Sequence, residues 1–422
     1  MTQDFRKTAH NLGRGSNQSG QRIYNERLVL SLVRRYGSLP KADIARLTGL
    51  SATTAMTIVR RLEADRLLLK NAPQRGRVGQ PSVPLSLNPN GAFSLGAKVG
   101  RRSADLVLID FTGGVRHEVH ERYDYPVPEA VVEFISAGSR ALARRLTVEE
   151  RSRIAGLGIA SPFELWNWEE EVGAPPGAME AWRGFDLRAE VGKAFKFPVY
   201  LCNDASAACA AELLFGKAAH HHDLLYIFIA WFIGGGVVLN GNLFLGRSGY
   251  AGALGPMLVS SNGDGTPSGR SLLGHASLYV LDRKIREAGG DPRSLWRSQS
   301  DWSAFESEVG PWIEETAAAL AHAIICATAV VDFQAVVIDG APPAAIRTRI
   351  VERINDKLAT MDRKGLAPFS VEEGSIGSNA RAIGGASLPF LAQFMRDREI
   401  LFLDTPSDAS GQESQVARRS AF

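Results

Sequence analysis

The sequence predicts an α/β protein in which a small helical unit precedes a much larger body of alternating strands and helices. Three observations lead to this prediction. Apolar residues recur at helical spacing in three short segments between residues 25 and 65. From residue 92 onward, apolar runs of strand length alternate with helical sequence. Residues 1–90 contain 15 Lys and Arg but only 5 Asp and Glu, whereas the remaining residues have a net charge of −7.

Length and composition exclude several classes of protein. The 422 residues, 45% of them hydrophobic and 22% charged, suit a globular protein of two or three domains. Three cysteines without regular spacing indicate neither a disulfide framework nor a C-x-x-C metal pair, which fits a cytoplasmic location. The longest uncharged run, residues 224–246, contains Gly-Gly-Gly and Asn-Gly-Asn. We therefore expect buried strands there and no membrane association.

Residues 21–88 are expected to fold as a winged helix-turn-helix, after a disordered tail at residues 1–20. The apolar spacing predicts a first helix that ends at Gly37, a short helix from Lys41 to Leu47 and, after a glycine-containing turn, a third helix capped by Ser51. Two short helices joined by such a turn are typical of a helix-turn-helix. The residues that follow predict a wing, in which two short strands flank a basic loop.

This unit is expected to bind a double-stranded DNA operator. The third helix would lie in the major groove, and arginines on it would contact phosphates, whereas those of the wing would reach phosphates or a minor groove. The alternative is a small helical bundle without a nucleic-acid partner, and the positive charge of the segment favours DNA. The predicted contacts are Ala52, Thr53, Thr54 and Thr57 at base edges, Arg60 and Arg61 at phosphates, and Arg75 and Arg77 in the wing.

The body opens with a strand, a tight loop and a second strand over residues 95–114. Lys98 precedes the loop, which contains Gly100, Arg101 and Arg102. Such a loop could present backbone N–H groups to a phosphate, bind another anion, or be a solvated hairpin tip. Residues 224–246 form a similar strand–turn–strand unit, which indicates an internal duplication.

A second candidate position is Asn203-Asp204, between a predicted strand and an Ala-rich helix. Asp204 could cap the helix by accepting hydrogen bonds from its first turn. It could equally face a cleft, because ligands of α/β sheets bind at the carboxyl ends of strands. The two roles are compatible, and the residues alone do not decide between them. Trp166 and Trp168 could form a stacking wall for a sugar ring, with burial in the core as the alternative.

The order of these features resembles the ROK family of repressors, open reading frames and kinases, and most of all its transcriptional regulators. The resemblance covers about residues 25–390, with the markers GQPSVPLSLNP, CNDASAA, IGGGVVLNGNLFLG and GYAGALGPM. It implies a duplicated actin-like (ribonuclease H-like) body of sugar-kinase type, with two lobes and a cleft between them, over residues 92–400. A polar tail follows at residues 404–422.

The resemblance further implies that the body has no ATP site of the family type and needs no cofactor. Kinase members carry an acid, which helps to place Mg²⁺, followed by Gly-Gly-Thr at the first hairpin. Lys98 stands at the position of the acid, and Arg101 and Arg102 replace the second Gly and the Thr. An ammonium group repels Mg²⁺, and bulky side chains keep a loop backbone away from phosphate. In the second phosphate loop, Trp231 and Phe232 replace the Thr and Gly of those kinases.

The family's sugar site is partly retained. The resemblance makes Asp204 the counterpart of the kinases' catalytic base, here vestigial. The Gly-Glu-x-Gly-His pattern that contacts sugar hydroxyls is Gly-Ala-Leu-Gly-Pro at residues 252–256, and the family's zinc-binding cysteine cluster is missing. We expect His220-His221-His222 to be a solvated loop without a metal, because three consecutive side chains on one loop converge poorly. The candidate effector-binding residues are Asn203, Asp204, Arg101 and Arg102.

Together these features predict a DNA-binding transcriptional regulator, in first place a repressor, of carbohydrate metabolism or uptake. It would respond to a sugar or sugar derivative, act as a homodimer or homotetramer, and have no enzymatic activity. The main alternative is an active sugar kinase that uses ATP and carries an accessory DNA-binding domain. A third hypothesis is a body that binds no ligand and only dimerises the DNA-binding part.

Overall fold

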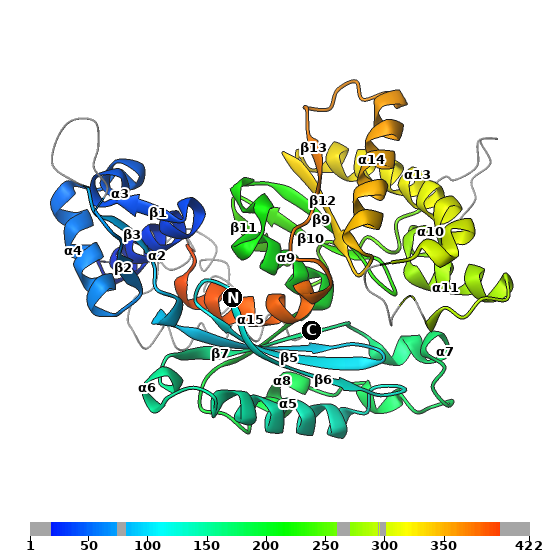
Figure 1. Ribbon diagram of the computed structural model, residues 1–422, viewed down its shortest axis with the longest axis horizontal. Helices are drawn as coiled ribbons and strands as arrows, with labels where there is room; N and C mark the ends of the chain where they lie inside the picture. Colours follow the sequence, from blue (N-terminus) through cyan, green and yellow to red (C-terminus); the bar gives the residue numbers. More distant parts are fainter. Residues whose placement is uncertain (1–17, 74–81, 260–270, 294, 296–300, 397–422) are drawn as a thin grey trace, which may run out of the picture.

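The computed structural model describes residues 18–73, 82–259, 271–293, 295 and 301–396, which form a small head and two larger lobes (Figure 1). The predicted wing contacts Arg75 and Arg77 and the predicted tail at residues 404–422 lie outside the described residues. The first helix begins at Gln18, so residues 18–20, which we predicted to be part of a disordered tail, are helical.

The head is a three-helix unit with a small antiparallel sheet of order β1-β3-β2. Its helix-turn-helix forms where the local signals predict it. Gly49 takes a left-handed φ of 68° after the second helix, and the Ser51 hydroxyl accepts a hydrogen bond of 3.1 Å from the Thr54 N–H at the start of the third. The elements are α2 (Gln18–Tyr36), β1 (Ser38–Pro40), α3 (Lys41–Thr48), α4 (Ala52–Ala64), β2 (Leu68–Lys70) and β3 (Pro84–Leu87).

The first lobe is a five-stranded sheet of order β6-β5-β4-β7-β8, in which β4, β5 and β6 pair antiparallel while β7 and β8 are parallel to β4. Helices α5 and α8 cover one face of this sheet, below it in Figure 1. The strands are β4 (Phe93–Val99), β5 (Ser103–Asp110), β6 (Val115–Arg122), β7 (Ile154–Ser161) and β8 (Val199–Asn203); the helices are α5 (Pro128–Ala143), α6 (Val148–Arg151), α7 (Glu169–Val172) and α8 (Leu187–Gly192).

The second lobe repeats this arrangement, with the order β11-β10-β9-β12-β13 and the same pairing directions. This repetition confirms the predicted duplicated, two-lobed body. Asn240 and Gly241 both have positive φ at the turn between β10 and β11, as the Asn-Gly signal predicts. The strands are β9 (Leu224–Ile229), β10 (Gly234–Leu239), β11 (Asn242–Phe244), β12 (Ala335–Gly340) and β13 (Ser370–Glu373); the helices are α10 (Leu273–Ala276), α11 (Leu278–Glu287), α13 (Glu306–Val330) and α14 (Ala344–Thr360).

Two further helices, α9 (Asp204–Phe215) and α15 (Ala380–Phe394), lie between the lobes. Helix α9 packs on β10 of the second lobe and against α15, which packs on β4 and β7 of the first lobe. The approach of α15 to its neighbours requires glycine. A Cβ on Gly384 would lie 1.8 Å from the Ala207 carbonyl oxygen of α9, and one on Gly158 of β7 would lie 1.9 Å from the Gly385 carbonyl oxygen of α15.

The head is packed on the body through one continuous apolar core. Val29 and Leu62 of the head share a cluster of buried side chains with Phe111, Leu214 and Phe390 of the body. The last two belong to α9 and α15. These two helices therefore extend from the space between the lobes to the base of the head, where Figure 1 shows α15 beside α2.

One helical stretch among the described residues, Ser303–Val330, is long and apolar enough to cross a membrane by length and hydropathy, and half of its most apolar window is buried. Its inward side chains, including Trp312, Leu320 and Ile324, belong to the apolar core of the second lobe. A core helix accounts for this pattern. The longest uncharged run in the sequence forms β9, β10 and β11, as expected from its turn signals.

Candidate DNA-binding helix and charged cluster between the lobes

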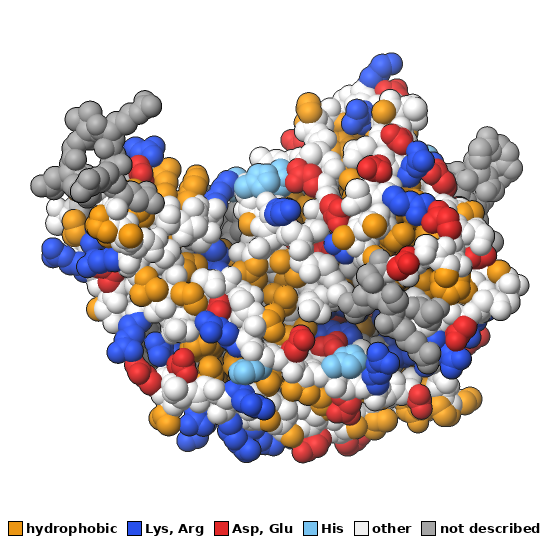
Figure 2. All heavy atoms as spheres, in the orientation of Figure 1, with side chains coloured by type: hydrophobic (Ala, Val, Ile, Leu, Met, Phe, Trp, Pro, Cys, Tyr) orange, Lys and Arg blue, Asp and Glu red, His pale blue; other side chains and the backbone are white. Residues whose placement is uncertain are grey.

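Helix α4 presents one apolar face to the head and one polar face to solvent. Ala55, Ile58, Val59 and Leu62 are buried at helical spacing. The predicted base-contacting residues Ala52, Thr53, Thr54 and Thr57, and the predicted phosphate contacts Arg60 and Arg61, are all exposed. The structure therefore places all six on the surface of one helix, and Figure 2 shows Lys and Arg side chains on the head around it.

The two arginines of α4 differ in their surroundings. The Arg61 guanidinium lies 3.4 Å from a Glu26 carboxylate oxygen on α2 and 3.8 Å from one of Asp65. These ion pairs compete with a phosphate for its charge. Arg60 lies one residue nearer the N-terminus of the helix, and no ion pair within the described part of the chain includes it. We therefore expect Arg60 to provide the stronger phosphate contact of the two.

In the body, Lys98 at the end of β4 is buried rather than displayed to a ligand. Its side chain is 9% exposed, and its Nζ donates to Asp105 Oδ2 at 2.7 Å and to Ser103 Oγ at 2.7 Å. Burial, together with the positive charge of Arg381, lowers the pKa of Lys98 to about 8. Asp105 also contacts His120 on β6. The position that the family resemblance matches to the kinases' acid is thus occupied by an internal ion pair.

Arg101 lies against a pair of neighbouring aromatic rings that belong to different lobes. Its guanidinium carbon is 5.2 Å from the ring centre of Trp168, in the first lobe, and 4.2 Å from that of Phe232, in the second. The two rings are themselves 4.3 Å apart. Burial lowers the pKa of Arg101 to about 10, which still leaves the group charged at neutral pH. This cation–π contact joins the lobes at the first hairpin.

The neighbouring Arg102 is engaged elsewhere, because its Nη2 donates to the Val172 carbonyl oxygen at the end of α7 at 2.7 Å. The structure thus assigns the two arginines of the loop to different partners. One N–H group of each loop is also occupied: the Gly100 N–H donates to the Ser103 carbonyl at 2.8 Å, and in the second loop the Ile233 N–H donates to Ser277 Oγ at 3.0 Å. Neither N–H is directed at an incoming phosphate.

At the start of α9, Asn203 and Asp204 divide the two roles that the sequence left open. Asn203 is the cap, since its Oδ1 accepts from the Ala205 N–H at 3.0 Å and from the Ser206 N–H at 3.4 Å. The Asp204 carboxylate is therefore released from capping. It accepts a hydrogen bond of 3.3 Å from Nη1 of Arg381, at the start of α15.

These groups form one charged cluster in the space between the lobes. The negative charge of Asp204 acts on both Lys98 and Arg101, and the positive charge of Arg381 lowers the pKa of both. Lys98 donates to Asp105 and Arg381 donates to Asp204, whereas Arg101 interacts with Asp204 through its charge alone. Such a cluster repels Mg²⁺ and attracts an anionic group.

Sequence reasoning missed Arg381 and Asp105, which complete this cluster. Arg381 is 177 residues from its partner Asp204, and an isolated arginine at the start of a helix carries no motif. Asp105 was detectable in principle. It lies opposite Lys98 in an antiparallel hairpin, and directly opposed residues interact across strands.

At their other ends, α9 and α15 contact the head. The Arg34 guanidinium of α2 lies 5.2 Å from the Phe215 ring centre at the end of α9 and 4.9 Å from that of Phe111, and its Nη2 donates to the Phe111 carbonyl at 2.9 Å. Beyond the end of α15, the Met395 carbonyl accepts from Arg27 Nη1 at 3.4 Å. The charged cluster and the head are thus connected by two rigid helices.

The chain matches two family models and several known proteins. The ROK family model matches residues 94–390, and a winged helix-turn-helix DNA-binding model matches residues 24–68. An uncharacterized protein of Sinorhizobium fredii is 26% identical over 375 residues, which cover 88% of this chain and 91% of the relative. The xylose repressor of Bacillus spizizenii is 26% identical over 261 residues, which cover 62% of this chain and 66% of the repressor.

Among solved structures, a ROK family transcriptional regulator, a homologue of the E. coli MLC protein, matches with a TM-score of 0.61 at 18% identity. The match covers 91% of this chain and 97% of that one, and it shows that the two share head and body folds. The family model alone covers more than half of the residues. The chain belongs to the ROK family.

Proposed function

We propose that this protein is a DNA-binding transcriptional regulator, in first place a repressor, of carbohydrate metabolism or uptake. The observation that carries the proposal is the exposed row of Thr53, Thr54, Thr57 and Arg60 along α4 of a winged head. Small polar side chains near the start of a recognition helix suit base edges in the major groove, and arginine suits the adjacent phosphates. The xylose repressor among the relatives supports a sugar-linked role.

The effector that we propose is a sugar derivative with a negative charge. Asp204 would accept hydrogen bonds from sugar hydroxyls, and Lys98, Arg101 and Arg381 lie within the range of its charge. Guanidinium groups bind carboxylates and phosphates through parallel hydrogen bonds. An acidic or phosphorylated sugar would therefore satisfy this cluster better than a neutral one.

The effector signal would reach the head through α9 and α15. Both helices begin at the Asp204–Arg381 pair and end against α2. A ligand that binds one arrangement of the lobes better than another would shift the orientation of the head and so the affinity for the operator. Useful specificity needs at least two heads, because one short recognition helix reads few base pairs. We therefore propose a cytoplasmic homodimer or homotetramer.

Fluorescence anisotropy with labelled DNA from upstream of the protein's own gene tests this function. We expect binding at low salt, and a change of at least about fivefold in the dissociation constant when the matching sugar derivative is added. A panel of neutral, acidic and phosphorylated sugars distinguishes the proposed effector class from neutral sugars. Absence of any binding at low salt would refute the proposal.

A sugar kinase with an accessory DNA-binding head is the second candidate, and the position of Asp204 at the start of α9 favours it. Against it, Arg381 holds the Asp204 carboxylate, and Phe232 and Arg101 stack where the phosphate loops of a kinase would lie. A coupled assay of ADP release over the same panel of sugars distinguishes a kinase from a regulator without activity. We expect no turnover above that of Asp204→Asn, and turnover abolished by this substitution would favour the kinase.

A further inference from the structure

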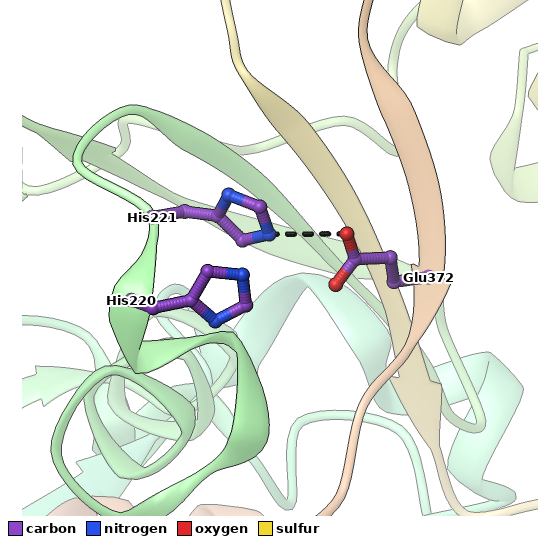
Figure 3. Close-up of side chains that lie close together, drawn as sticks. All are labelled: His220, His221 and Glu372. Carbon is purple, nitrogen blue, oxygen red and sulfur yellow. Dashed lines mark hydrogen bonds and ion pairs between the residues drawn. The ribbon is translucent and has the colours of Figure 1, made fainter.

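Three side chains of metal-binding type meet on the second lobe, next to the head (Figure 3). His220 and His221 follow α9, and Glu372 lies on β13. One ligand atom from each lies within 4.8 Å of the other two, and His221 Nε2 is 3.1 Å from Glu372 Oε1. His220 is exposed and His221 and Glu372 are half-buried, so the position is open to ions from solvent. Figure 2 shows histidine side chains at the surface between the head and this lobe.

The two adjacent rings converge because the backbone changes conformation between them. His220 is the last residue of the short 3₁₀-helix η5 (Lys217–His220), whereas His221 is extended, with φ −78° and ψ 141°. Their ring centres are consequently 3.9 Å apart. His222 points elsewhere, and its Nε2 lies 3.1 Å from Arg35 Nη1 on α2. The expectation of poor convergence therefore holds for His222 but not for its two neighbours.

Hydrogen bonds orient the potential ligands as in established metal sites. His220 Nδ1 is 2.8 Å from the Lys217 carbonyl oxygen. A carbonyl only accepts, so Nδ1 carries the proton and Nε2 keeps its lone pair. Figure 3 shows the other ring nitrogen of His220 directed toward Glu372. Glu372 Oε1 also accepts from Ser370 Oγ at 2.5 Å. Partners of this kind hold ligands in position and strengthen metal binding.

The two segments that supply the ligands are braced by the buried carboxylate of Glu212, near the end of α9. Its Oε1 accepts from the Ala218 N–H in η5 at 3.1 Å, and its Oε2 accepts from the Ser375 N–H, just after β13, at 3.0 Å. Ser375 Oγ in turn accepts from the Lys217 N–H at 2.9 Å. The ligand geometry is thus fixed by the fold, which lowers the cost of ordering the site when an ion binds.

The donor set selects the type of ion. Two imidazole nitrogens and one carboxylate oxygen are ligands of Zn²⁺ in sites that leave a fourth position to water, whereas Mg²⁺ and Ca²⁺ require more oxygen ligands. We propose that His220, His221 and Glu372 form a binding site for one Zn²⁺ ion. It is separate from the Asp204 cluster and uses none of the family's cysteine positions.

The site also adjoins the head, since the His220 carbonyl oxygen accepts a hydrogen bond of 2.7 Å from Arg35 Nη2 on α2. An ion bound to the His220 ring would restrain this carbonyl. We therefore expect Zn²⁺ to slow hydrogen exchange in α2. This readout involves neither DNA nor a sugar, so it succeeds or fails independently of the proposed function.

The test uses untagged full-length protein treated with a chelator and dialysed. Zn²⁺ affinity is measured by competition with a chromophoric chelator, and Co²⁺ is used as a spectroscopic probe. We expect one equivalent of Zn²⁺ per chain and the visible absorption of four-coordinate Co²⁺. Glu372→Gln and His221→Gln should each weaken binding at least about tenfold, since loss of a supporting partner alone typically costs that much.

Two variants serve as matched controls. His222→Gln changes the same loop without removing a proposed ligand, and Cys326→Ser removes an exposed thiol; both should bind Zn²⁺ like the wild type. Melting curves of the metal-free variants show whether each is folded. The proposal is overturned if the wild type binds no Zn²⁺ at micromolar concentrations, or if folded Glu372→Gln and His221→Gln bind it unchanged.

Discussion

The close contact between α9 and α15 predicts that the substitution Gly384→Ala destabilises the protein. In Gly384→Ala the new Cβ would lie 1.8 Å from the Ala207 carbonyl oxygen and 2.2 Å from its carbon, whereas such contacts are essentially never shorter than 3.0 Å. Both obstructing atoms are backbone, so no side-chain rotation relieves the clash. Nor can α15 retreat toward the first sheet, because Gly158 and Gly96 already touch its backbone there.

The loss of stability in Gly384→Ala is the balance of two opposed effects. Replacing glycine by alanine inside a helix stabilises by up to about 1 kcal/mol when space is free. Overpacking of a close-packed interface costs about 1–3 kcal/mol and occasionally more. Since α15 is confined on both sides, we expect the upper end of that range, and a net loss of about 2 kcal/mol or more in the free energy of unfolding. The helices must separate until 1.8 Å becomes at least 3.0 Å.

Urea denaturation followed by tryptophan fluorescence measures this loss, and Gly192→Ala is the matched control. Gly192 ends α8, and a Cβ there meets nothing within 4 Å. The control should therefore unfold at the same or a slightly higher urea concentration than the wild type, while Gly384→Ala unfolds earlier. If Gly384→Ala were as stable as the control, the inferred confinement of α15 would be wrong.

Three further predictions concern charged groups. Between pH 8 and 10.5, the folded protein has released the Lys98 proton while the unfolded chain retains it. The free energy of unfolding of the wild type should therefore rise with pH relative to that of Lys98→Met, by up to about 3 kcal/mol. Parallel pH dependences of the two proteins in urea denaturation would contradict this. A double-mutant cycle of Arg101→Met and Phe232→Leu should give a coupling energy of about 1–2 kcal/mol in the same assay, and simple additivity would show that the cation–π contact contributes nothing. Arg60→Ala should weaken operator binding at several salt concentrations and lower the salt slope by about 1, more than Arg61→Ala, whose guanidinium is already paired; equal effects in anisotropy titrations would refute the distinction.

Local signals were sufficient to predict the helices of the head and several strands of the body. Ser51 caps a helix and Gly49 ends one because of short-range hydrogen bonds and backbone conformation. A window of five or six residues therefore determines where these helices begin and end. Helix α13 shows the limit of such reasoning. Proline usually marks the first turn or the end of a helix, whereas α13 begins at Glu306 and continues through Pro311.

The roles of the site residues were harder to predict from the sequence, because they depend on partners that are distant along the chain. Asn and Asp are almost equally good caps, so only the fold could assign the cap to Asn203 and the ion pair between the helices to Asp204. The partner that decides the outcome, Arg381, arrives from the last helix. Likewise, the histidine loop becomes a metal site only through Glu372, 151 residues away from His221. Sequence spacing contains no information about such encounters unless a family motif marks both members.

The contacts between the lobes have energies of the size that the proposed switch requires. Arg101 connects the lobes through Trp168 and Phe232, and Asp204 connects α9 to α15 through Arg381. A cation–π contact removed from water contributes about 2 kcal/mol, and allosteric coupling energies are typically 1–3 kcal/mol. A ligand that draws the guanidinium of Arg101 or Arg381 onto its own anionic group would therefore replace one of these contacts at a cost comparable to the required coupling. Because both helices end on the head, the arrangement that the ligand favours is also the arrangement in which the head is held.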